Sequence, residues 1–217
     1  MTKNEVFRYI DHTQLKATAT WEAIEKLCEE SIQYKTASVC VPPTFVKRIH
    51  DQYGDKVNVC TVIGFPLGYH TTEVKVFEAK KAIEDGANEV DMVINIGDAK
   101  AHDFKAVEEE IKAVKSACKD KILKVIIETC YLTEEEKIEL CKCVTNAKAD
   151  YIKTSTGFGT AGAMLADIEL FKKHIGPDVK IKAAGGMKTK EDMFAFLEAG
   201  AERLGTSSGV SLLNGED

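Results

Sequence analysis

Two lysines in this chain each end a short apolar run that is followed by a loop of small residues. Lys153 closes Tyr151-Ile152-Lys153 before Thr-Ser-Thr-Gly, and Lys182 lies in Ile181-Lys182 before Ala-Ala-Gly-Gly. Burying an ammonium group without compensation is costly. Two such lysines on consecutive strands would crowd positive charge at one point and lower each other's pKa. A lysine amine becomes a nucleophile near neutral pH in this way, so the pair predicts Schiff-base chemistry.

Asp91 is the third unusual residue, because it interrupts an apolar run, Glu89 to Asn95, that is typical of a buried strand. A carboxylate there needs a cationic or hydrogen-bonding partner, and an inward orientation would place it near the two lysines. We interpret Asp91 as a proton shuttle or an electrostatic anchor for a lysine, with a structural ion pair as the alternative. Lys180 is an internal comparison, since it begins its strand and should be solvated at the opposite face.

The elements that must position these residues alternate regularly along the chain. Eight apolar runs predict strands at Tyr9–His12, Ala37–Val41, Val57–Ile63, Glu89–Asn95, Ile122–Glu128, Tyr151–Thr154, Lys180–Ala184 and Arg203–Thr206. Amphipathic segments predict helices at Trp21–Tyr34, Pro43–Gln52, Thr71–Gly86, Ala99–Lys119, Thr133–Ala147, Gly162–His174, Thr189–Gly200 and Ser207–Leu213.

This alternation predicts an α/β fold with a parallel sheet and helices outside it. Eight repeats in 217 residues favour one (β/α)8 TIM barrel over residues 1–217, with a short N-terminal helix. An open doubly wound sheet is the alternative, but its G-x-G-x-x-G turn after the first strand is missing.

Active sites of this barrel lie at the carboxyl ends of the strands, often with a phosphate held by the loops after strands seven and eight. Gly185 and Gly186 follow the seventh predicted strand, and Ser207 and Ser208 follow the eighth. Glycine N–H groups and serine hydroxyls suit an anion, so we predict phosphate binding there. Further residues near strand ends are candidate substrate contacts or mouth residues: Asp11, His12, Thr13, Cys40, Glu128, Thr129 and Thr154. For Cys40, simple packing is the alternative.

Composition excludes several other classes of protein. The net charge of −6 argues against a nucleic-acid-binding surface. No apolar stretch approaches about 20 residues, and the N-terminus lacks the apolar centre of a signal peptide. The seven cysteines show no C-x-x-C spacing, which favours free thiols in a reducing cytoplasm. The histidines show no metal-ligand spacing, so we expect no metal site.

These motifs together resemble the deoxyribose-phosphate aldolases, a family of class I, Schiff-base aldolases with a (β/α)8 fold. The segments that carry the resemblance are YIDHT (9–13), SVCVPP (38–43), GFPLG (64–68), EVDMVIN (89–95), IKTSTGF (152–158) and KAAGG (182–186). One difference from some members is Phe158, where a further lysine can follow Ser-Thr-Gly.

The resemblance implies roles for individual residues. The Schiff-base lysine of the family falls on Lys153, the second lysine that perturbs its pKa and relays protons on Lys182, and the proton donor and acceptor on Asp91. The phosphate contacts of the family fall on Gly185, Gly186, Ser207 and Ser208.

The implied activity is that of a carbon–carbon lyase in deoxyribonucleotide catabolism. It would reversibly cleave 2-deoxy-D-ribose 5-phosphate to acetaldehyde and D-glyceraldehyde 3-phosphate. Its partners would be these small molecules, without nucleic acid or membrane, and the family allows a monomer or a homodimer. Two rival functions stay open at this point: a phosphate-binding barrel isomerase with Asp91 or Glu128 as its base, and a sugar-phosphate-binding protein without catalysis.

Overall fold

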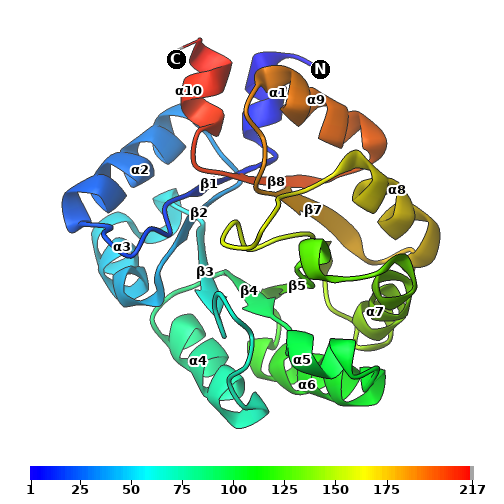
Figure 1. Ribbon diagram of the computed structural model, residues 1–217. Coiled ribbons are helices and arrows are strands. Elements are labelled where there is room, and N and C mark those ends of the chain that lie inside the picture. The colour runs from blue at the N-terminus through cyan, green and yellow to red at the C-terminus, as the bar shows by residue number, and fades with distance from the viewer. Residues whose placement is uncertain (216–217) are drawn as a thin grey trace.

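Eight parallel strands form a closed ring, and the helices surround it (Figure 1). The structure is a computed structural model that describes residues 1–215. Glu216 and Asp217, the last two residues of the predicted domain over 1–217, lie outside the described residues. The strands are β1 (Ile10–Thr13), β2 (Ser38–Val41), β3 (Val59–Ile63), β4 (Glu89–Val93), β5 (Ile122–Ile126), β6 (Tyr151–Lys153), β7 (Lys180–Ala184) and β8 (Arg203–Thr206). They pair in chain order and close through β8 and β1, which confirms the predicted barrel.

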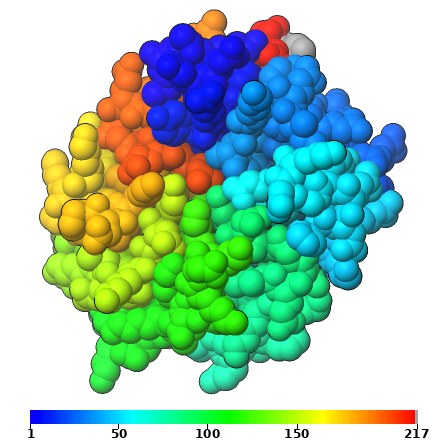
Figure 2. All heavy atoms as spheres, turned by 180° about the vertical axis from the view of Figure 1, so that it is seen from behind, coloured from blue at the N-terminus to red at the C-terminus, as the bar shows by residue number. Residues whose placement is uncertain are grey.

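The helices connect successive strands and cover the outside of the ring. They are α1 (Lys3–Phe7), α2 (Trp21–Tyr34), α3 (Val46–Tyr53), α4 (Thr72–Glu84), α5 (Ile96–Lys100), α6 (Phe104–Cys118), α7 (Glu134–Asn146), α8 (Leu165–His174), α9 (Lys190–Ala199) and α10 (Gly209–Asn214). Short 3₁₀ turns lie at Pro43–Phe45, Gly54–Lys56 and Thr129–Tyr131. The predicted N-terminal helix is α1, which contacts α10, and the view from behind shows the blue N-terminal residues beside red residues near the C-terminus (Figure 2). Among residues 1–215, no helix combines the length and the apolar character that crossing a membrane requires.

Two predicted helices have different boundaries in the structure. The single helix expected over Ala99–Lys119 is two helices, because His102 has a positive φ of 57° and Asp103 caps a new helix by accepting a hydrogen bond from the N–H of Ala106. The helix expected from Gly162 begins only at Leu165. The segment before it passes instead over the end of β7, where Ala163 N–H donates to the carbonyls of Ala184 and Gly185.

The strand register brings the unusual polar residues to matching heights. Lys153 pairs directly with Lys182 across β6 and β7, and Asp91 pairs with Lys124 across β4 and β5. Directly paired residues of parallel strands point to the same face, so each pair shares a side of the sheet. Lys180 begins β7, and its side chain is about half exposed, as predicted for the comparison lysine.

Candidate active site

Lys153 and Lys182 meet at one carboxylate oxygen inside the barrel. The Nζ atoms of both lysines lie 2.7 Å from Oδ2 of Asp91, which is fully buried. The sequence prediction that Asp91 faces the two lysines is therefore confirmed. Gly205 of β8 leaves room for this arrangement, since a Cβ at that position would lie 3.0 Å from Cε of Lys182.

The expectation that the two lysines lower each other's pKa is wrong for Lys182. Burial opposes the charge of Lys182, but the carboxylates of Asp11 and Asp91 outweigh it, so its pKa is raised above the ordinary lysine value. Lys182 donates hydrogen bonds to both of these carboxylates. It is therefore a permanent buried cation beside Lys153.

Three charged residues that the sequence analysis missed complete the cluster. Lys124 contacts Asp91 at 2.9 Å and Asp11 at 3.4 Å, and it also pairs with Glu89. Arg203 pairs with Glu89 at 2.9 Å and with Asp11. A signal was present in the sequence, because Lys124 interrupts the apolar run Ile122-Leu123-Lys124-Val125-Ile126 just as Asp91 interrupts its own run.

The ion pairs of this cluster leave one cation in excess. The members of this barrel-interior network are the cations Lys124, Lys153, Lys182 and Arg203 and the anions Asp11, Glu89 and Asp91. Burial alone would raise the pKa of Asp91, but the three neighbouring ammonium groups hold it well below its usual range. All three carboxylates thus have cationic partners, and the network becomes balanced when one lysine is neutral.

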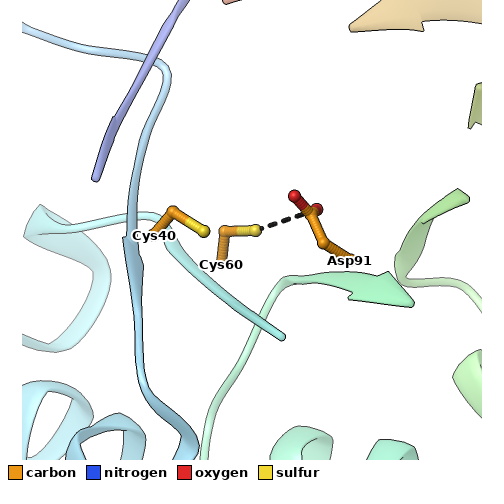
Figure 3. Close-up of side chains that lie close together, drawn as sticks. All are labelled: Cys40, Cys60 and Asp91. Atoms are coloured by element: carbon orange, nitrogen blue, oxygen red, sulfur yellow. Dashed lines mark hydrogen bonds between the residues drawn. The ribbon is translucent and has the colours of Figure 1, made fainter. Parts of the chain in front are cut away.

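Cys40 and Cys60, on β2 and β3, point towards Asp91 (Figure 3). The Cys60 thiol donates to Oδ1 of Asp91 at 3.2 Å, and burial raises its pKa, which keeps it protonated. The spacing of these three side chains would suit a metal ion, as would that of Asp11, Cys60 and Glu89. However, the ammonium of Lys124 already lies 3.2 Å from the Cys60 sulfur and contacts all three carboxylates of these sets. A metal cation would have to displace it, so the donor set fits a lysine better.

A cavity of about 410 Å³ opens above the network at the carboxyl ends of β1, β6, β7 and β8. Lys153 lies at its lining, whereas Lys182 and Asp91 are buried below and are not part of the lining. The four predicted phosphate residues also line this cavity: Gly185, Gly186, Ser207 and Ser208. Gly185 and Gly186 have φ values of 73° and 78°, a conformation that favours glycine. The structure therefore places the Lys153 amine and the predicted anion-binding loops around one cavity.

The predicted substrate contacts occupy different positions. Thr13 lines the cavity. Asp11 lies in the buried network, where it also accepts a hydrogen bond from the Ser38 hydroxyl at 2.7 Å. Cys40 is buried beside Cys60, and the Thr154 hydroxyl bridges β6 and β7 by accepting from Ala184 N–H at 3.1 Å. The last three side chains lie outside the lining of this cavity.

The other residues at the ends of β1 and β5, His12, Glu128 and Thr129, do not line the cavity. His12 points outward, with Nε2 2.7 Å from Glu30 of α2. Glu128 is buried and accepts hydrogen bonds from the N–H and hydroxyl of Thr156. It therefore fastens the start of the β6–α8 loop, and Thr129 is buried next to it. The carboxylate of Glu128 is engaged in holding this loop in place.

We expect Lys124→Met to lower the free energy of unfolding by about 3–5 kcal/mol, because it removes the buried cation that contacts all three carboxylates of the network. Lys180→Met is the matched control, since it removes a lysine from a barrel strand where the ammonium is solvated. That change should stay within about 0.5 kcal/mol. Urea unfolding of both variants measures the difference, and equal stabilities would contradict a network held by Lys124.

Known proteins with similar sequences and folds are aldolases. The family model described as DeoC/LacD family aldolase matches residues 6–214. A deoxyribose-phosphate aldolase from Clostridium botulinum (strain Alaska E43 / Type E3) is 62% identical over 217 residues, covering 100% of this chain and 98% of that protein. The enzyme of the same name from Clostridioides difficile (strain 630) is 58% identical over 212 residues, covering 98% and 97%.

Solved structures show the same fold. A tetrameric deoxyribose phosphate aldolase from Aeropyrum pernix superposes with a TM-score of 0.92 at 30% identity, over 98% of this chain and 91% of that one. An aldolase named QR15 gives a TM-score of 0.92 at 41% identity, over 97% and 95%. With its paired barrel lysines and a family match over nearly all its length, the chain belongs to the DeoC/LacD family of aldolases.

Proposed function

We propose that the protein reversibly cleaves 2-deoxy-D-ribose 5-phosphate to acetaldehyde and D-glyceraldehyde 3-phosphate through a Schiff base on Lys153. The observation that carries this proposal is the position of Lys153 between a buried carboxylate and the cavity. Close relatives that cover the whole chain bear the name of this activity.

The neutral amine that this chemistry needs follows from the charges of the network. With every member ionised, four cations face three carboxylates. Lys153 is the one of these cations that lines the cavity, so it is the amine that a substrate can reach and the one that the proposed Schiff base requires to be neutral. The remaining three cations then match the three anions, and no buried charge is left without a partner.

The amine of Lys153 would attack C1 of the open-chain sugar to form a carbinolamine, and loss of water gives an iminium ion. The two products have two and three carbons, so the bond that breaks is C2–C3. The hydroxyl at C3 gives up its proton to a water molecule, which can return a proton to C2 in the next step. The C3 oxygen becomes the aldehyde of the three-carbon product, and the C2–C3 electron pair moves to the iminium to form an enamine. Protonation of C2 and hydrolysis then release acetaldehyde and restore Lys153.

Asp91 and Lys182 support these steps from below the cavity. Oδ2 of Asp91 accepts hydrogen bonds from both lysine Nζ atoms, so it orients the Lys153 amine and links it to the ammonium group of Lys182. The carboxylate also stabilises the iminium charge that develops on the same nitrogen. Lys182 remains a cation throughout, because two carboxylates raise its pKa.

The geometry disfavours the rival isomerase with a carboxylate base. Asp91 is saturated by lysines below the cavity, and Glu128 holds the β6–α8 loop. Neither carboxylate lines the cavity where a carbon acid would bind. Binding of a sugar phosphate without catalysis would not require two lysines that share one buried carboxylate.

The cellular setting and assembly are further parts of the proposal. All seven cysteines are free thiols, which fits a reducing cytoplasm. The relative from Aeropyrum pernix is described as a tetramer, and the family resemblance allows a monomer or a homodimer for this chain. Lysine supplies the electron sink in the proposed reaction, so the proposal includes no cofactor.

Trapping of the Schiff base tests the proposed function directly. Borohydride added with acetaldehyde should leave a covalent two-carbon adduct on Lys153, seen by peptide mass spectrometry. Lys153→Leu should abolish both the adduct and the cleavage of 2-deoxyribose 5-phosphate, with its fold retained by circular dichroism. Wild-type protein that releases acetaldehyde without an adduct at this residue would contradict the assignment.

Lys182→Leu tests the charge balance of the network. In the variant, the network with a protonated Lys153 has three cations and three anions, whereas the wild-type network has four cations. Protonation of Lys153 is therefore more favourable in the variant. We expect the pH profile of adduct formation with acetaldehyde to move upward by about one pH unit or more. Lys180→Leu, two residues earlier on β7, is the control and should keep the wild-type profile. An unchanged profile in a folded Lys182→Leu variant would exclude this coupling.

A further inference from the structure

The cavity above Lys153 has an unusual distribution of charge for a protein of net charge −6. None of the residues that line it is acidic, and two are lysines, Lys153 and Lys16. The loops after β7 and β8 contribute backbone groups and the hydroxyls of Thr206, Ser207 and Ser208. These groups are neutral hydrogen-bonding partners for an anion, so a bound anion must find its opposite charge in a lysine.

Lys16 is placed to supply that charge. It follows β1, which pairs with β8, so it lies beside the loop of Ser207 and Ser208. Its backbone is fixed, because its N–H donates to the Gln14 side chain at 3.2 Å and its carbonyl accepts from Ala19 N–H at 3.0 Å. The Lys16 ammonium is exposed and takes part in none of the ion pairs among residues 1–215, so its charge remains available to a ligand.

Apart from Lys153, the rest of the cavity lining offers no competing charge. Phe158 lies there with half of its side chain exposed, and its ring packs edge-on against Phe65 with 5.4 Å between centroids. Lys153 itself is committed to Asp91 and, in the proposed reaction, to the sugar aldehyde. Lys16 is therefore the cation left for the far end of the substrate.

We infer that Lys16 binds the phosphate of the substrate and is the residue that selects phosphorylated over unphosphorylated sugars. This inference rests on the proposed function for the identity of the sugar. The flexible Lys16 side chain would close over a phosphate already held by the N–H and hydroxyl groups of the two loops. Lys16 would contribute to substrate affinity, and the chemistry at Lys153 would proceed without it.

Kinetics on two substrates separate this role from a structural one. Lys16→Met should raise KM for 2-deoxyribose 5-phosphate about tenfold, the effect of losing one charged contact, while kcat changes less than about twofold. Its kcat/KM for unphosphorylated 2-deoxyribose should stay at the wild-type value, and Lys16→Arg should restore most of the affinity for the phosphate ester. Lys26→Met is the matched control, because Lys26 is an exposed lysine on α2 outside this cavity.

The outcomes that overturn the inference are also specific. An unchanged KM for the phosphate ester in Lys16→Met, or an equal loss on both sugars, would exclude a phosphate-binding role. Calorimetric binding of inorganic phosphate gives a readout that needs no turnover, and its Kd should rise about tenfold in Lys16→Met but not in Lys26→Met. If the wild-type protein cleaves neither sugar, the proposed function fails, while this phosphate titration still decides the role of Lys16.

Discussion

The carboxylate of Asp91 is the centre on which the site depends. Three lysine ammonium groups contact its two oxygens inside a barrel whose interior would otherwise be filled with branched apolar side chains. Such a cluster is stable only if nearly every charge has a partner, because an uncompensated buried ion costs several kcal/mol. Two further carboxylates and Arg203 meet this requirement. The four cations of the network exceed its three carboxylates by one, and Lys153 is the cation among them that lines the cavity.

The site therefore has two layers with different tasks. The lower layer is buried and ionic, and it surrounds and orients the amine of Lys153. The upper layer is an open cavity with neutral walls and one exposed lysine, and it binds the remainder of the ligand. A substitution in the lower layer affects stability and pH dependence, whereas one in the upper layer affects affinity and selectivity.

Much of this arrangement could be predicted from the sequence, because single charged residues in apolar runs are visible there. Lys153, Lys182 and Asp91 were identified in this way, and the strand alternation gave the closed barrel that brings them together. Lys124 carries the same signal but is hidden by the large number of surface lysines in this chain. The local pattern does not show the carboxylates on distant strands that compensate the charge of Lys182. For that reason the predicted lowering of the Lys182 pKa is wrong. The break at His102 was missed because it depends on a positive φ within a helix-like pattern.

The loop after β6 and the loop after β7 are tied together by backbone hydrogen bonds, with Ala163 N–H donating to Ala184 and Gly185. Gly162 and Gly185 approach so closely that a Cβ on Gly162 would lie 2.4 Å from the Gly185 carbonyl carbon. The segment that carries the amine and the segment that faces the ligand's other end thus form one rigid frame. In the proposed function, such a frame keeps the distance between the Lys153 amine and the loop after β7 nearly constant. A sugar with one carbon more or fewer between its aldehyde and its anionic group would then reach only one of these two places.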